Sequence, residues 1–309
     1  MMWRVPGMKD LLALRGIVTV LNTPFTAEDA LDLPGLRRNV QGAIRAGVAG
    51  FLVPAMASEV DRLSAAERRS LVETVIEESR GRVPVIGGAS AGSDAERLAR
   101  ARELLELGCP GLLVSIPLEN EAQYEREVRT LDDLGPGFLM LQDWDFHGHG
   151  LPVPLISRLF ENVASFRCLK VEVVPAGVKY SEVLRATGGR LHVSGGWAVA
   201  QMIEALDRGV HALMPTGLHE LYVKIDLLYR GGRREEAREM FERLLPVLAF
   251  SNQHLDLSIR FFKRLLWRQG LYATPRVREP LLPFDAVHER LADELIERVL
   301  GMIREVAGP

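Results

Sequence analysis

Residues 106–116, "ELGCPGLLVSI", form one of three similar segments, the others being "RAGVAGFLVPA" (45–55) and "DRGVHALMPTG" (207–217). Each follows a charged, amphipathic stretch, reaches a glycine and soon passes into an apolar run. Glycine is favoured just past a helix C-terminus because it accepts a positive φ. An uninterrupted apolar run suits a strand that is buried on both faces, as in a parallel sheet. Each segment therefore predicts a joint between a helix and a buried strand.

The same pattern recurs along the chain and predicts eight strands. They are expected near residues 16–25, 49–54, 83–90, 111–117, 137–143, 166–172, 190–196 and 211–217. Helical patterns lie between them; in one, Ser64 and Glu67 have the spacing of a capping box, and Gly81 is expected to end the helix. Eight βα units of even size favour a closed (β/α)8 barrel of the α/β class over an open, doubly wound sheet.

The pattern changes after residue 230, where three helical periods follow one another with no strand between them. We therefore expect a barrel over residues 1–230, including a short N-terminal tail, and a helical C-terminal extension over residues 231–309.

Composition narrows the class of protein. The 38 basic and 41 acidic residues give a formal net charge of -3 and are mixed along the chain, so we expect no nucleic-acid partner. No stretch reaches the roughly 18 apolar residues of a membrane span, and the N-terminus lacks the apolar core of a signal peptide. We expect a cytoplasmic protein without membrane contact. The two cysteines, Cys109 and Cys168, suggest neither a disulfide framework nor a zinc site.

In a (β/α)8 barrel the active site lies at the carboxyl ends of the strands, so the polar residues that end each apolar run are the candidates. The candidates are Thr23, Ser58, Glu59, Ser90, Ser115, Gln142, Asp143, Lys170, Glu172, Ser194, Gly195, Gly196, Thr216 and Gly217.

Lys170, in "FRCLKVE" (166–172), differs from these mostly small or neutral residues. Alternation places Cys168, Lys170 and Glu172 on one face of the predicted sixth strand. Burial lowers the pKa of a lysine from its usual value of about 10.4, and a neutral amine can attack a ketone to form a Schiff base. An ionised Glu172 would instead favour the ammonium. A structural lysine that reaches water or Glu172 is the alternative from this segment alone.

Together, "VLNTPF", "SEVDRLSAAER", "VPVIGG", the lysine of the sixth strand, "VSGG" and "VREPLLPFD" resemble the dihydrodipicolinate synthase and N-acetylneuraminate lyase family. The resemblance runs from about residue 15 to about residue 285. It implies a (β/α)8 barrel with a helical extension, a homo-oligomer (tetramer or dimer), and Lys170 as the residue that binds a 2-oxo acid as a Schiff base. No cofactor and no metal are implied.

The chain departs from the family pattern at three places. The Gly-Thr-Thr-Gly-Glu stretch, which holds the carboxylate of the keto acid in the family, corresponds to "AMASE" (55–59), so only Glu59 keeps the pattern and Ser58 adds a hydroxyl. The tyrosine that relays protons corresponds to Gln142, which cannot act as a general acid or base near neutral pH. The tyrosine expected after Pro117 is also absent.

Another group must then move the proton, and the candidates are Asp143, Glu172, His147 and His149. The two histidines could instead be metal ligands or lie in a solvated turn. The glycines after the seventh and eighth strands either bind an anionic group or satisfy tight turns, and Trp144 and Trp197 either wall the pocket or pack under loops.

We therefore expect a Schiff-base-forming carbon–carbon lyase or aldolase acting on a 2-oxo acid or related carbonyl compound. Lys170, Gln142 and Glu172 are the expected catalytic residues. The expected substrate-binding residues are Thr23, Ser58, Glu59, Asp143, Gly195 and Gly196. A dehydratase of a sugar-acid type substrate that uses the same iminium, and a non-catalytic barrel that binds a small carboxylate, are the alternatives.

Overall fold

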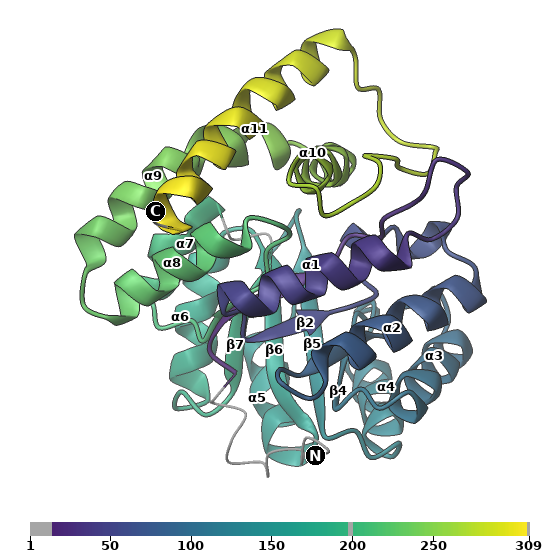
Figure 1. Cartoon of the computed structure of the whole chain (residues 1–309). Helices are drawn as coiled ribbons and strands as arrows, with labels where there is room; N and C mark the ends of the chain where they lie inside the picture. Colours follow the sequence, from purple (N-terminus) through teal and green to yellow (C-terminus); the bar gives the residue numbers. More distant parts are fainter. Residues whose placement is uncertain (1–13, 197–199, 308–309) are drawn as a thin grey trace. The chain divides into compact units, whose positions relative to one another are not determined.

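The computed structural model describes residues 14–196 and 200–307 (Figure 1). Eight parallel strands follow one another in chain order around a closed barrel, which confirms the predicted (β/α)8 fold. The strands are β1 (Gly16–Val20), β2 (Gly50–Leu52), β3 (Val85–Gly88), β4 (Gly111–Val114), β5 (Phe138–Asp145), β6 (Phe166–Val173), β7 (His192–Gly195) and β8 (Ala212–Leu213).

Helices occupy the expected places between the strands. They are α1 (Leu33–Ala46), α2 (Ala65–Ser79), α3 (Asp94–Glu106), α4 (Glu121–Asp132), α5 (Val153–Asn162), α6 (Ala176–Ala186), α7 (Met202–Asp207) and α8 (His219–Arg230). Two short 3-10 helices, η2 (Met56–Ser58) and η3 (Val60–Arg62), follow β2. The C-terminal helices are α9 (Arg234–Ser251), α10 (Leu255–Arg268) and α11 (Ala286–Ala307).

The three repeated joints have the backbone that their glycines predict. Gly47, Gly108 and Gly209 have φ values of 96°, 97° and 84°, which L side chains rarely adopt. Each glycine lets the chain turn out of a helix and enter β2, β4 or β8. All residues of these three strands are buried, as expected for strands covered on both faces.

The capping box at α2 is present as predicted, since the Ser64 side chain accepts from the Glu67 amide and the Glu67 carboxylate accepts from the Ser64 amide. The helix ends at Ser79, and the following Arg80 adopts a left-handed conformation together with Gly81.

The chain divides into two compact units. Unit 1 comprises residues 14–18, 84–196 and 200–214 of the described chain, and unit 2 comprises residues 19–83 and 215–307. Unit 1 contains the adjacent strands β3 to β8 with α3 to α7, and β8 also pairs with the start of β1.

Unit 2 contains β2 and the helices α1, α2 and α8 to α11. Within it, α8 contacts α1, α9 and α11, and α10 contacts α9, α11 and η2. The boundary expected near residue 230 falls between α8 and α9, inside this unit. Among the described helices, none is long and apolar enough to cross a membrane.

The joint glycines give a test of this backbone. Replacing Gly209 by alanine should lower the free energy of unfolding by about 1–2 kcal/mol, because a Cβ at positive φ is strained even though no other atom lies within 4 Å of its position. Gly42 lies within α1, where a Cβ makes only ordinary contacts, so Gly42→Ala should raise the free energy of unfolding by about 0.5–1 kcal/mol. Urea unfolding of the two variants measures the difference, and equal effects would contradict the conformations described.

Candidate active site

The register of β5, β6 and β7 places three polar side chains at one level of unit 1. Gln142 pairs with Lys170, and Lys170 pairs with Ser194. Residues that pair directly in parallel strands point to the same face of the sheet, and alternate residues along a strand share that face. Gln142, Lys170 and Ser194 therefore lie side by side, and Glu172 lies on the same face two residues further along β6.

The Lys170 amine is buried and has a carboxylate partner. The residue is 6% exposed, and its Nζ donates to Glu172 Oε2 at 3.0 Å. Gln142 Nε2 donates to the same carboxylate oxygen. Since a lone buried charge is costly, the pairing offsets the burial of both groups. A lysine bonded to a carboxylate in this way can pass its proton to that carboxylate and become a nucleophile.

Because Gly196 has no side chain, there is room beside it for the Glu172 carboxylate. A Cβ at residue 196 would lie 2.1 Å from Glu172 Oε1, so any side chain there would displace the carboxylate. Gly195 pairs with Val171 at the level between Lys170 and Glu172. These two expected binding residues thus adjoin the Lys170–Glu172 pair, and Gly196 shapes it.

The structure does not bring Asp143 to Lys170. Asp143 pairs with Val171, so its side chain points to the opposite face from Lys170. Its Oδ1 accepts from the Leu151 amide at 2.7 Å, and its Oδ2 lies 3.4 Å from Lys179 Nζ. Burial raises the pKa of the Asp143 carboxyl, and Lys179 opposes this rise.

Lys179 and Asp143 together hold the segment that follows β5. The fully buried Lys179 ammonium donates to the backbone carbonyls of His149 and Leu151. Sequence reasoning missed Lys179, although a lysine within the apolar stretch "AGVKYSEV" was a signal.

The two histidines after β5 lie in this segment. His149 Nε2 lies 2.9 Å from Glu182 Oε2, and both side chains are exposed. The His147 amide donates to Asp145 Oδ1 at 2.9 Å. Across residues 14–196 and 200–307, no group of three or more histidine, cysteine, aspartate or glutamate side chains is arranged to hold a metal ion. Trp197, a candidate pocket wall, lies outside the described residues.

In unit 2, the hydroxyls of Thr23 and Ser58 are bonded to the backbone. Thr23 Oγ1 donates to the Ser58 carbonyl at 2.7 Å, and Ser58 Oγ donates to the Leu21 carbonyl at 2.6 Å and accepts from the Ala55 amide. Both residues are fully buried. Their hydroxyls therefore fix the loop after β2 to the end of β1.

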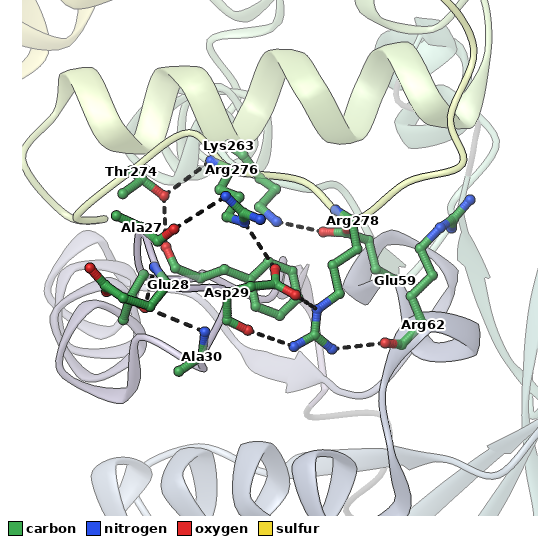
Figure 2. Close-up of polar contacts among 12 residues, drawn as sticks. Ala27, Glu28, Asp29, Ala30, Glu59, Arg62, Lys263, Thr274, Arg276 and Arg278 are labelled. Atoms are coloured by element: carbon green, nitrogen blue, oxygen red, sulfur yellow. Dashed lines mark hydrogen bonds and ion pairs between the residues drawn. The ribbon is translucent and has the colours of Figure 1, made fainter.

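Glu59 ends the same loop and is held by the C-terminal part of unit 2 (Figure 2). Its Oε1 accepts from Lys263 Nζ at 2.5 Å, and its Oε2 accepts from the Arg278 amide at 2.9 Å. Lys263 is fully buried, and its ammonium lies 4.2 Å from the centre of the Phe25 ring. Burial lowers the pKa of Lys263 to about 8, an effect that Glu59 opposes.

Arg278 extends this connection to the loop that follows β1. Its guanidinium forms ion pairs with Asp29 at 3.2 Å and Glu67 at 2.6 Å, and Arg276 also pairs with Asp29. Glu59 therefore has internal partners at both carboxylate oxygens. Sequence reasoning missed Lys263, for which the signal was a lysine between phenylalanines and leucines in "RFFKRLL".

Comparison with known proteins identifies the class. A model of the dihydrodipicolinate synthetase family matches residues 13–298, and the chain belongs to this family. The family consists of lyase- and aldolase-type enzymes, and the chain is an enzyme of this type, as the sequence predicted.

Two relatives show how divergent the chain is. It is 28% identical to an L-2-keto-3-deoxyarabonate dehydratase of Azospirillum brasilense over 86% of this chain and 88% of the relative. It is 27% identical to a 4-hydroxy-tetrahydrodipicolinate synthase of Xanthomonas axonopodis pv. citri over 94% of this chain and 96% of the relative.

Solved structures share the fold. The dihydrodipicolinate synthase of Rhodopseudomonas palustris has a TM-score of 0.84 at 21% identity, covering 92% of this chain and 97% of its own. The N-acetylneuraminate lyase of Fusobacterium nucleatum has a TM-score of 0.80 at 17% identity, covering 93% and 99%.

The position of Asp143 gives a stability test. Asp143→Ala should lower the free energy of unfolding by about 3 kcal/mol or more, because it leaves the buried Lys179 ammonium without its carboxylate. Glu161→Ala removes an exposed ion pair with Arg190 and should cost less than about 1 kcal/mol. Denaturant unfolding measures both values. A stable Asp143→Ala protein that has lost ligand binding would instead place Asp143 in the substrate site.

Proposed function

We propose that the protein is a Schiff-base-forming carbon–carbon lyase or aldolase that acts on a 2-oxo acid or related carbonyl substrate through Lys170. The observation that carries this proposal is the buried Lys170 amine, 3.0 Å from the Glu172 carboxylate. Membership of a family of lyase- and aldolase-type enzymes supports it.

In the proposed first step, Glu172 takes a proton from the Lys170 ammonium, and the neutral amine attacks the C2 carbonyl of the substrate. The product is a carbinolamine with a new bond between carbon and nitrogen. Glu172 then returns the proton to the carbinolamine hydroxyl, which leaves as water while the nitrogen lone pair forms the iminium. Gln142, bonded to the same carboxylate, orients it. Glu172 thus takes the role of proton shuttle at a site where glutamine occupies the tyrosine position.

The iminium then accepts the electron pair of the bond between C3 and C4 as that bond breaks. The hydroxyl on C4 gives its proton to the Glu172 carboxylate, C4 becomes a carbonyl carbon and C3 becomes part of an enamine. Glu172 then protonates C3, and hydrolysis of the resulting iminium releases a shorter 2-oxo acid and restores Lys170. The reverse sequence forms the bond.

A dehydratase is the second candidate, favoured by the relative named as an L-2-keto-3-deoxyarabonate dehydratase. The same iminium acidifies C3, and loss of a proton from C3 followed by a hydroxide from C4 gives an unsaturated product and water. The products separate the two candidates, since a lyase releases two carbonyl fragments and a dehydratase releases one dehydrated product.

The family resemblance also leads us to propose that the protein is a cytoplasmic homo-oligomer, either a tetramer or a dimer. Exposed apolar side chains on the helices of unit 2, such as Leu227, Leu245 and Val287, agree with subunit contacts.

Trapping the Schiff base tests the proposal. Incubation with pyruvate or a longer 2-oxo acid, followed by borohydride, should add one reduced ligand to the protein, and peptide mapping should place it at Lys170. Lys170→Ala should take up none. Peptides with the buried Lys179 and Lys263 serve as internal controls and should stay unmodified. Measurable binding of 2-oxo acids without any adduct would overturn the proposal in favour of a non-catalytic barrel.

The role of Glu172 has its own test. Glu172→Gln should slow adduct formation near neutral pH by about a hundredfold or more, because it removes the group that takes and returns the proton. Glu172→Asp should recover part of the rate. Glu182→Gln, at an exposed carboxylate paired with His149, is the matched control and should keep the wild-type rate. Stopped-flow measurement of trapping rates against pH distinguishes these cases, and an unchanged rate in Glu172→Gln would exclude the shuttle.

A further inference from the structure

Two aromatic side chains are exposed at the carboxyl end of β5. Trp144 is 49% exposed and Phe146 is 39% exposed, and their rings meet edge to face with centroids 5.6 Å apart at 77°. Removing a large aromatic side chain from water is energetically favourable. An apolar group of a ligand can therefore bind favourably against this exposed aromatic pair.

The aromatic pair adjoins the Lys170–Glu172 pair. Trp144 is the direct register partner of Glu172, as Gln142 is of Lys170. Trp144 therefore shares the face that carries Gln142 and lies roughly 7 Å further along the strand, given the rise of about 3.3 Å per residue. A substrate whose C2 is bound to Lys170 and whose chain extends past Glu172 reaches the level of Trp144.

The turn that carries Phe146 is fixed by its own hydrogen bonds. Asp145 accepts from the amides of His147 at 2.9 Å and Gly150 at 3.3 Å. Before it, Asp143 accepts from the Leu151 amide. Because the turn is bonded at both ends, the rings are presented without a large entropic cost on binding.

We propose that Trp144 and Phe146 determine specificity by binding an aromatic group carried on C4 of a 4-hydroxy-2-oxo acid. The inference rests on the proposed function and names its substrate class. Cleavage breaks the bond between C3 and C4. The C4 hydroxyl gives its proton to the Glu172 carboxylate and becomes the carbonyl of an aromatic aldehyde, while the electron pair of the broken bond passes to the Lys170 iminium and yields the enamine. The aromatic aldehyde leaves from the ring pair, and the enamine is protonated and hydrolysed to the shorter 2-oxo acid.

Selectivity between two substrates tests this inference. The wild-type protein should show a higher kcat/KM for a 4-phenyl than for a 4-methyl 4-hydroxy-2-oxo acid. Trp144→Ala should reduce that ratio tenfold or more, mainly through the KM of the phenyl compound, and Trp144→Phe should restore most of it. Trp267→Ala changes a tryptophan of similar exposure, 38%, on α10 of unit 2 and should leave the ratio unchanged.

Three outcomes would overturn the inference. If the wild-type enzyme forms the Lys170 adduct but shows no preference for the phenyl compound, the inferred specificity is wrong and the proposed function stands. If Trp144→Ala lowers kcat/KM equally for both substrates, the tryptophan positions Glu172 and does not select the substrate. A changed molar mass of Trp144→Ala by light scattering, with an unchanged ratio, assigns the ring pair to a contact with a second copy of the chain. Absence of any adduct at Lys170 instead rejects the proposed function itself.

Discussion

The parallel register of β5, β6 and β7 is the constraint on which the candidate site depends. Pairing of Gln142 with Lys170 and of Trp144 with Glu172 decides which side chains share a face and which do not. A shift of one residue would bring Asp143 beside Lys170 and remove Gln142. Both strands are buried along most of their length, and the register of a buried strand is strongly specified.

The repeat of helix, glycine and apolar run was sufficient to predict the fold. All eight strands fall within or beside the expected ranges, because the signal is local and recurs at Gly47, Gly108 and Gly209. Alternation along β6 likewise placed Lys170 and Glu172 on one face. The pairing of Lys179 with Asp143 and of Lys263 with Glu59 could not be predicted, since each joins residues distant in sequence through packing.

Three buried lysines differ in their partners and in their place in the fold. Lys179 donates to two carbonyls beside Asp143, and these groups stabilise an ammonium. Lys263 lies against Glu59 and an aromatic ring, and burial lowers its pKa to about 8. Lys170 donates to the Glu172 carboxylate, which also accepts from Gln142. Lys263 also pairs with a carboxylate, so the ion pair alone does not distinguish these lysines. What supports Lys170 as the nucleophile is its place on β6, level with Gln142 and Ser194.

The most direct test is the structure of crystals soaked with a 2-oxo acid, without reduction. Our account predicts continuous density between Lys170 Nζ and C2 of the ligand, with the Glu172 carboxylate within hydrogen-bond distance of that nitrogen. A ligand bound elsewhere without a covalent bond, with Lys170 still paired to Glu172, would contradict it.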